Sequence, residues 1–206
     1  MHEIIPGILE KDWSAIEQKI DRVRPFAKTI HIDLIDGVFA PNTTFLDPEP
    51  FKKYTDDFLF EVNLMVDEPE KFIEAWSRVG FRRFLGHVEK MSDQVAFVAK
   101  AQEVGEVGLA LDGNTDISQI KINLQDLDSL LIMTINAGFS GQEFEAKNLD
   151  KVKELSQKTS IPIGIDGGIT PNAIEQGLKS GATRFVSTSY LFSGDSEGNY
   201  KKLREA

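Results

Sequence analysis

Residues 162–181 read PIGIDGGITPNAIEQGLKSG and contain the signals of one strand, one turn and one helix. A short apolar run predicts a strand over 162–165, and two glycines then lead to Thr170, a typical N-cap residue. Pro171 suits the first turn of a helix expected over 171–179, and Gly181 suits its C-terminal cap. This stretch therefore predicts one strand-to-helix unit of the kind that repeats around a parallel sheet.

Short apolar runs alternate with longer amphipathic segments along the whole chain of 206 residues. The pattern predicts eight strands, over residues 4–8, 29–34, 58–64, 83–87, 107–111, 129–135, 162–165 and 184–187. Further helices are predicted over 13–23, 69–79, 92–104 and 148–157. Ser92 suits an N-cap, and Gly80 and Gly105 suit C-terminal caps.

Eight such units closed in a ring form a (β/α)8 TIM barrel, an α/β fold. We expect it to form one compact domain over residues 1–206, because no linker composition divides the chain. A doubly wound open sheet is the alternative. It usually needs fewer units, and the first strand-to-helix turn here lacks the glycine fingerprint of a dinucleotide site.

Composition excludes several classes of protein. A formal net charge of -10 disfavours a nucleic-acid partner, although backbone amides can still hold a small phosphate monoester. The absence of cysteine excludes disulfides and thiolate sites, so a metal would need His, Asp, Glu or Asn. No apolar run approaches a membrane span, and the N-terminus lacks signal-peptide features, so we expect a cytoplasmic protein without a membrane partner.

Polar side chains at strand ends are the functional candidates, because active sites in this fold lie at the C-terminal ends of the strands. His31 and Asp33 alternate in the second strand and share a face, as expected for a metal site, an acid/base pair or a buried hydrogen bond. Asn63 ends the third strand and could bind a substrate hydroxyl or a metal, or serve as a turn residue. His87 and Glu89 end the fourth strand and could be structural or functional.

Two glycine-containing loops could hold an anion. The segment 134–142 is polar and long enough to fold over a ligand. After the seventh strand, Asp166 precedes Gly167, Gly168 and a helix start, so backbone amides and a candidate acid/base group lie together. A tight strand-to-helix turn is the structural alternative for this second loop.

Five segments, in the same order along the chain, resemble the motifs of the pentulose-5-phosphate 3-epimerase (ribulose-phosphate 3-epimerase) family. Residues 31–44 resemble HxDxMDGxFxPNxT, 63–66 resemble HLMV, 134–142 resemble TVNPGFGGQ, 166–169 resemble the DGG element, and 181–192 resemble GAxxxVxGSxxF.

The resemblance implies an isomerase of the pentose phosphate pathway that interconverts D-ribulose 5-phosphate and D-xylulose 5-phosphate through an enediolate. It implies that Asp33 and Asp166 act as acid and base, and that His31, Asp33 and Asp166 bind a divalent cation (Zn, Fe, Mn, Co or Mg). We expect a small phosphorylated sugar as partner, and a homo-oligomer. The residues expected to contact the substrate or its phosphate are Gly7, Asn63, Met65, Gly138, Ser140, Gly141, Gln142, Gly167, Gly168, Thr188 and Ser189.

The chain also departs from the family pattern. Asn63 stands where the family has a fourth metal-binding histidine, which predicts weak binding, a preference for harder ions, or no metal. Gly7 replaces a serine, Ala137 a proline, Thr188 a glycine and Ile35 a methionine. These changes leave two alternatives open: a related sugar-phosphate aldolase or decarboxylase, and a catalytically weak sugar-phosphate-binding homologue.

Overall fold

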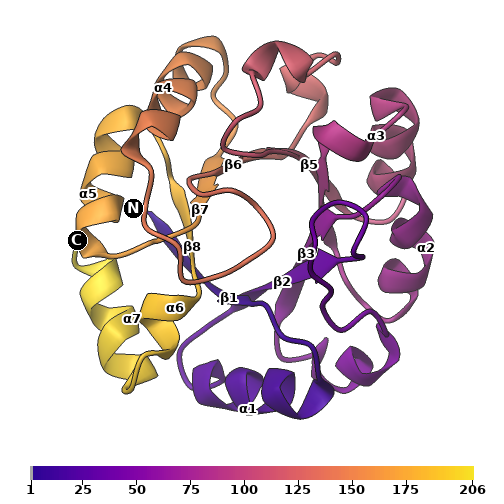
Figure 1. The fold of residues 1–206 in the computed structure, drawn as a ribbon. Coiled ribbons are helices and arrows are strands. Elements are labelled where there is room, and N and C mark those ends of the chain that lie inside the picture. The colour runs from indigo at the N-terminus through magenta and orange to yellow at the C-terminus, as the bar shows by residue number, and fades with distance from the viewer. Residues whose placement is uncertain (1) are drawn as a thin grey trace.

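The computed structural model describes residues 2–206 and contains a closed barrel of parallel strands in sequential order (Figure 1). The strands are β1 (Glu3–Ile8), β2 (Thr29–Ile35), β3 (Leu59–Met65), β4 (Arg83–His87), β5 (Glu106–Leu111), β6 (Ser129–Met133), β7 (Ile163–Asp166) and β8 (Arg184–Ser187). β1 pairs with both β2 and β8, which closes the ring. The predicted TIM barrel is confirmed.

Helices cover the outside of the barrel (Figure 1). They are α1 (Trp13–Val23), α2 (Glu70–Arg78), α3 (Gln94–Gln102), α4 (Leu149–Lys158), α5 (Pro171–Ser180), the short α6 (Ser189–Phe192) and α7 (Ser196–Arg204). The 3₁₀ helices are η1 (Glu49–Tyr54), η2 (Val88–Lys90), η3 (Ile117–Gln119), η4 (Leu124–Asp126) and η5 (Ala146–Asn148).

Two crossovers contain 3₁₀ turns in place of an α-helix. η1 connects β2 to β3, and η3 and η4 connect β5 to β6. Pro48 and Pro50 flank the start of η1, and each removes a backbone donor that a longer helix would use. Phe51 of η1 is fully buried against Phe60 and Trp76, so this short element still covers the outside of β3.

The cap residues test the predicted helix boundaries. Thr170 accepts a hydrogen bond from the Ala173 amide, and Gly181 has a φ of 101°, so both predicted caps of α5 are confirmed. The predicted N-cap Ser92 is wrong. Asp93 caps α3 by accepting from the Ala96 amide at 2.9 Å, while the Ser92 hydroxyl donates to a neighbouring carboxylate.

Gly105 follows α3, but its φ is not left-handed as a glycine cap would require. A Cβ atom at this position would lie 2.2 Å from the carbonyl oxygen of Arg82. The Glu106 amide donates to this same oxygen at 2.7 Å, where β5 joins β4. Close backbone approach, and not helix capping, is therefore the reason for glycine here.

Strand alternation produces two apolar layers. Ile30, Ile32 and Leu34 of β2 point outward into the large cluster beneath the helices. A smaller cluster fills the inside of the barrel and comprises Ile5, Leu85, Ala110, Leu131, Met133, Ile135 and Val186. Polar groups occupy the inside above and below this cluster, and they form the sites described below.

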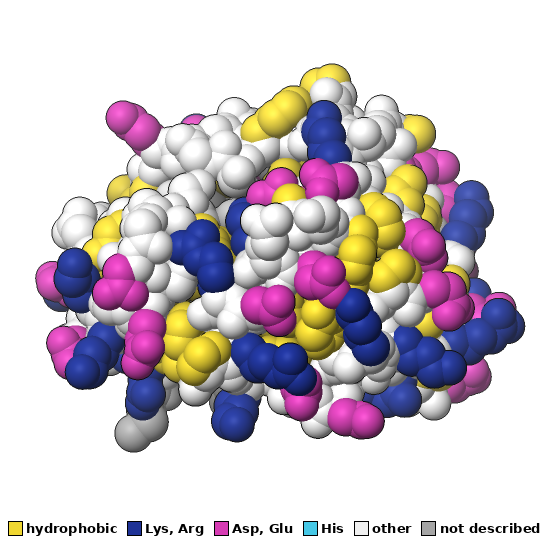
Figure 2. Space-filling view, turned by 90° about the horizontal axis from the view of Figure 1, so that it is seen from below, with side chains coloured by type: hydrophobic (Ala, Val, Ile, Leu, Met, Phe, Trp, Pro, Cys, Tyr) yellow, Lys and Arg dark blue, Asp and Glu magenta, His cyan; other side chains and the backbone are white. Residues whose placement is uncertain are grey.

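The surface carries charges of both signs. On the face shown in Figure 2, Lys and Arg side chains are interspersed with Asp and Glu side chains and are not gathered in one basic area. Within residues 2–206, none of the helices combines the length and apolar character that a bilayer crossing requires.

We predict that Gly105→Ala lowers the free energy of unfolding by about 1–3 kcal/mol, because the new methyl group would force apart the backbones of β4 and β5. Urea denaturation measures the effect. Glu103→Ala, an exposed change two residues earlier, serves as the control and should stay within about 0.5 kcal/mol of the parent protein. Equal stability of the two variants would contradict the close-approach explanation.

Candidate functional site

Three buried ligand-type side chains meet at the C-terminal end of the barrel. His31 and Asp33 project inward from β2, and Asp166 ends β7. His31 Nε2 lies 3.3 Å from Asp33 Oδ1 and 3.9 Å from Asp166 Oδ2. One ligand atom from each residue lies within 4.8 Å of the others, so the structure brings together the three predicted metal ligands.

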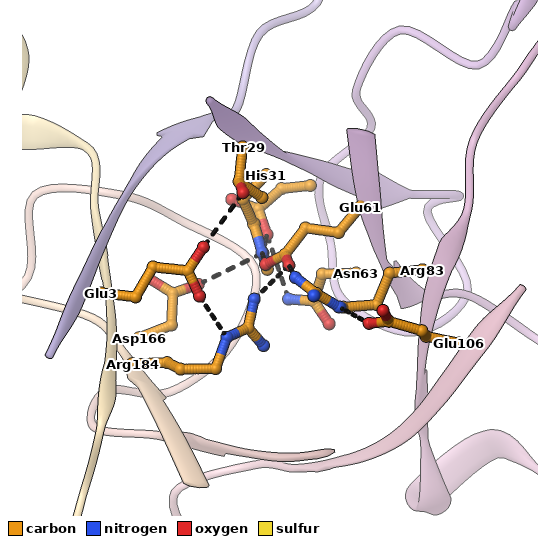
Figure 3. A network of polar contacts seen from close by, with 10 residues as sticks. Glu3, Thr29, His31, Glu61, Asn63, Arg83, Glu106, Asp166 and Arg184 are labelled. Carbon is orange, nitrogen blue, oxygen red and sulfur yellow. Dashed lines mark hydrogen bonds and ion pairs between the residues drawn. The ribbon is translucent and has the colours of Figure 1, made fainter. Parts of the chain in front are cut away.

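Glu61 sets the orientation of His31 (Figure 3). The two residues are paired across β2 and β3, and His31 Nδ1 lies 2.6 Å from Glu61 Oε1. A carboxylate can only accept, so Nδ1 carries a proton and Nε2 faces Asp33 and Asp166. Among residues 2–206, this buried Nε2 has no hydrogen-bond partner.

Glu61 in turn belongs to a charged network at the N-terminal end of the barrel interior (Figure 3). Arg83 Nη1 donates to it at 2.7 Å, and Arg184 Nη2 also donates to it. The same arginines bind Glu106 at 2.6 Å and Glu3 at 2.9 Å, respectively. Burial opposes the charge of Glu61, but the Arg184 guanidinium and the His31 hydrogen bond outweigh burial and hold the pKa of Glu61 well below its usual value.

The buried and charged surroundings of this cluster shift the pKa values of His31 and Asp166. Burial lowers the pKa of His31, but the nearby carboxylates of Asp33 and Glu61 raise it to about 10. Burial and the charge of Asp33 raise the pKa of Asp166 to about 8, against the opposing effect of His31. The cluster therefore favours extra positive charge, as protons or as a cation.

The donor set fits a divalent cation. One imidazole nitrogen and two carboxylate oxygens suit zinc, iron, manganese or cobalt, and the unpartnered Nε2 is directed at both carboxylates. The Glu61 contact fixes the tautomer that leaves Nε2 free, as outer carboxylates commonly do for metal-binding histidines. The residues present could thus hold a metal at this position.

Asn63 makes a different contact from the one expected of a fourth ligand. It is fully buried opposite Asp33 in the β2–β3 register, and its Nδ2 donates to Asp33 Oδ1 at 3.0 Å. Its Oδ1 has no hydrogen-bond partner within the described chain. In this orientation the amide supports the Asp33 carboxylate, and the imidazole and the two carboxylates remain the candidate ligand set.

A cavity of about 460 Å³ opens beside the two aspartates. Of the residues predicted to contact a ligand, those lining the cavity are Asp33, Met65, Gly138, Ser140, Gly141, Gln142, Asp166, Gly167, Gly168, Thr188 and Ser189. His31 and Asn63 lie behind this wall, and Gly7 is not part of it. Most of the predicted contact residues therefore share one cavity, with apolar side chains such as Ile135 and Phe144 completing its wall.

A larger hollow of about 730 Å³ lies at the N-terminal end of the barrel. It is lined by Arg83 and Arg184, but both arginines are bound to glutamates of the network described above. These two arginines are therefore already paired with carboxylates. The reactive carboxylates place the candidate site at the C-terminal end, where this fold carries its active sites.

Gly7 and Thr188, two of the departures noted above, are in contact. A Cβ atom at position 7 would lie 2.4 Å from Thr188 Oγ1 and 2.8 Å from Val186 Cγ1. A side chain at position 7 and the threonine at position 188 therefore exclude each other. Thr188, which directly follows β8, occupies this space and contributes to the cavity wall.

Loop contacts fix the end of β7. The Thr134 hydroxyl lies 2.9 Å from the carbonyl oxygen of Asp166 and 2.6 Å from that of Gly167. Gly167 and Gly168 have φ values of 114° and 67°, so the turn after Asp166 needs glycine. Thr134 belongs to the 134–142 segment, whose motif therefore has a structural role beside any contact with a ligand.

Sequence reasoning did not single out Glu61. Its position two residues before Asn63 places both on the inner face of β3, which was the available signal. His87 and Glu89 are hydrogen-bonded to each other at 3.0 Å and do not line the cavity.

Comparison with known proteins agrees with this geometry. The model of the ribulose-phosphate 3 epimerase family matches residues 3–192. The ribulose-phosphate 3-epimerase of Bacillus subtilis is 32% identical over 202 residues, covering 93% of each chain. That of Treponema pallidum is 33% identical over 199 residues, covering 93% of this chain and 91% of the relative.

Solved structures share the fold at lower identity. 3-Keto-L-gulonate-6-phosphate decarboxylase from Vibrio cholerae superposes with a TM-score of 0.74 at 13% identity, covering 100% of this chain and 97% of the other. 3-Hexulose-6-phosphate synthase from Salmonella typhimurium gives 0.72 at 11% identity, covering 98% of this chain and 97% of the other. These structures support the barrel, while the match over residues 3–192 and the similar relatives show that the chain belongs to the ribulose-phosphate 3-epimerase family of enzymes.

Proposed function

We propose that the protein interconverts D-ribulose 5-phosphate and D-xylulose 5-phosphate. The observation that carries the proposal is the pair Asp33 and Asp166, which line one cavity beside the unpartnered His31 Nε2. Family membership and the names of the similar relatives support the substrate class. The keto sugar would lie between the two carboxylates, with its reacting carbon within reach of both.

Inversion at a carbon next to a carbonyl requires one base and one acid on opposite faces of the substrate. Asp33 lines the cavity and accepts a hydrogen bond from Asn63, which fixes the orientation of its carboxylate and suits it as the base. The raised pKa of Asp166, caused by burial and the Asp33 charge, suits it as the proton donor at neutral pH. In the reverse reaction the two roles exchange.

A metal would be held by His31, Asp33 and Asp166, and when bound it would supply charge stabilisation for the oxygens of the enediolate. Glu61 would keep the His31 lone pair directed at the ion. Asn63 would orient Asp33 from the other side. With this ligand set, manganese, iron, cobalt and zinc are all candidate ions.

We assign the phosphate to the turn at Gly167 and Gly168 and to the segment at Thr188 and Ser189. Both segments line the cavity, and they follow β7 and β8, where barrels of this type commonly bind phosphate. Backbone amides at such turns can hold an anion without a cationic side chain. This agrees with the net charge of -10.

A sugar-phosphate lyase is the second candidate, favoured by the loss of the fourth ligand at Asn63. Aldol cleavage and decarboxylation also pass through an enediolate. Incubation in deuterated water separates the candidates, because an epimerase incorporates deuterium at C3 and breaks no carbon–carbon bond, whereas a lyase yields shorter products.

We predict that the protein loaded with Mn, Fe, Co or Zn interconverts the two pentulose phosphates, and that Asp33→Asn and Asp166→Asn each reduce kcat by about 10²–10⁴-fold. The amide keeps the shape of each side chain but cannot exchange the proton. A coupled assay for xylulose 5-phosphate measures the rate. The exposed Asp116→Asn is the matched control and should keep full activity; absence of turnover with every metal would contradict the proposal.

We predict that Asn63→His binds Mn or Zn at least about tenfold more tightly than the parent chain, because imidazole replaces an amide as the fourth ligand. Competition titration with a chromophoric chelator measures the affinity without reference to activity. Asn63→Ala, which loses the contact with Asp33 and supplies no ligand, should not gain affinity. Equal affinity of the histidine and alanine variants would show that Asn63 does not limit metal binding.

The pKa shifts at the site predict that the metal-free protein loses stability as the pH rises from 6 to 9. The folded-state pKa values of His31, about 10, and Asp166, about 8, both exceed their ordinary values, so the folded state binds more protons than the unfolded state in this range. Denaturation with EDTA present should show a loss of about 1–3 kcal/mol. Asp166→Asn, which resembles the protonated aspartate, should flatten the profile, and a rising profile would contradict the prediction.

A further inference from the structure

His87, the last residue of β4, and the partly buried Glu89 of η2 form a pair that the proposed chemistry does not use. His87 is fully buried, its ring packs against Phe39 with centroids 4.7 Å apart, and its Nδ1 lies 3.0 Å from Glu89 Oε2. The other oxygen, Glu89 Oε1, accepts a hydrogen bond from the Asp112 amide at 2.7 Å. Glu89 therefore connects the end of β4 to the residue that follows β5.

Asp112 extends this connection to the loop after β6. Its Oδ1 accepts a hydrogen bond from the Ala137 amide at 2.7 Å. Lys151 Nζ holds the backbone next to it, donating to the carbonyl oxygens of Asp112 at 3.0 Å and Gly113 at 2.6 Å. The backbone of Asp112 is thus fixed by both Glu89 and Lys151, while its side chain reaches the loop.

The loop after β6 crosses the opening of the barrel and supplies part of the cavity wall (Figure 1). Gly138, Phe139, Ser140, Gly141 and Gln142 all line the cavity. On the opposite side of the loop, Asn42 Nδ2 donates to the carbonyl oxygen of Gly138 at 2.8 Å. Asn114 Nδ2, from the connection after β5, donates to Asn136 Oδ1 at 2.7 Å, so the Asp112 carboxylate, which accepts from the Ala137 amide, is one of several side chains that hold this wall in place.

We propose that Asp112 is a positioning residue that, oriented by Glu89 and His87, holds residues 137–142 over the cavity through the amide of Ala137. The inference depends on the proposed function only in the choice of a sugar phosphate as ligand. The amide hydrogen is essential to it, because a proline at position 137 would have no donor for the carboxylate. A hydrogen bond to a charged acceptor is stronger than one between neutral groups.

Hydrogen–deuterium exchange of the full-length protein tests the inference without any need for activity. Asp112→Ala should speed exchange of the amides in residues 137–142 by about tenfold, as expected for the loss of one charge-assisted hydrogen bond. Asp112→Asn keeps an oxygen acceptor and should stay within about twofold to threefold of the parent. The matched control is Asp116→Ala, an exposed acid in the same connection that contacts only its own turn and should change nothing.

A double-mutant cycle identifies the donor. Ala137→Pro removes the amide hydrogen and should raise loop exchange by about the same factor as Asp112→Ala. Because each variant removes the same hydrogen bond, the double variant should show no further increase. Independent, multiplicative effects would overturn the assignment of Ala137 as the partner.

Kinetics distinguish positioning of the wall from general stability. With ribulose 5-phosphate, Asp112→Ala should raise KM by about fivefold to tenfold and leave kcat within about twofold, with Asp112→Asn restoring KM. Unchanged loop exchange in Asp112→Ala would overturn the inference even if the variant melts at a lower temperature. Faster exchange in a protein that turns over neither pentulose phosphate would support the loop contact while contradicting the proposed function.

Discussion

The buried carboxylate of Glu61 is the group on which the rest of the site depends. It is 0% exposed, and its charge is balanced by Arg83, Arg184 and the His31 imidazole. Loss of one partner of a buried ion pair leaves an uncompensated charge, which typically costs about 3–5 kcal/mol. The two arginines fix the position of the Glu61 carboxylate, and this carboxylate keeps the proton of His31 on Nδ1. The charged network at the N-terminal end of the barrel therefore determines that Nε2 is the nitrogen facing the two aspartates.

The register of β2 and β3 carries this constraint into the chemistry. His31 pairs with Glu61, and Asp33 pairs with Asn63, so each candidate site residue of β2 has a hydrogen-bonding partner directly opposite on β3. The Glu61 carboxylate accepts from His31 Nδ1, which leaves the lone pair of the imidazole on Nε2. The Asn63 amide donates to the Asp33 carboxylate. With both β2 side chains held in this way, His31 Nε2 lies 3.3 Å from Asp33 Oδ1 and 3.9 Å from Asp166 Oδ2.

The fold could be predicted from sequence because its signals are local. Alternating apolar runs located every strand, and Thr170 and Gly181 located the ends of α5. Features that depend on distant segments could not be predicted. The contact of Glu61 with Arg184 joins residues 123 apart, and Gly105 is required by the carbonyl oxygen of Arg82, just before β4. At the site, alternation grouped His31 with Asp33, whereas the orientation of the Asn63 amide depends on a neighbouring strand.

Four of the five departures from the family pattern have a partner in the structure, and this explains how they coexist with an intact barrel. Gly7 leaves the space that Thr188 occupies, Ala137 supplies an amide hydrogen that Asp112 accepts, and the smaller Asn63 donates to Asp33. The hydrogen-bond partners of Glu61 are His31, Arg83 and Arg184, and none of these four positions is among them. The differences therefore lie in the wall and the loop around the cavity and beside Asp33, while the elements that bring the two aspartates to one cavity are retained.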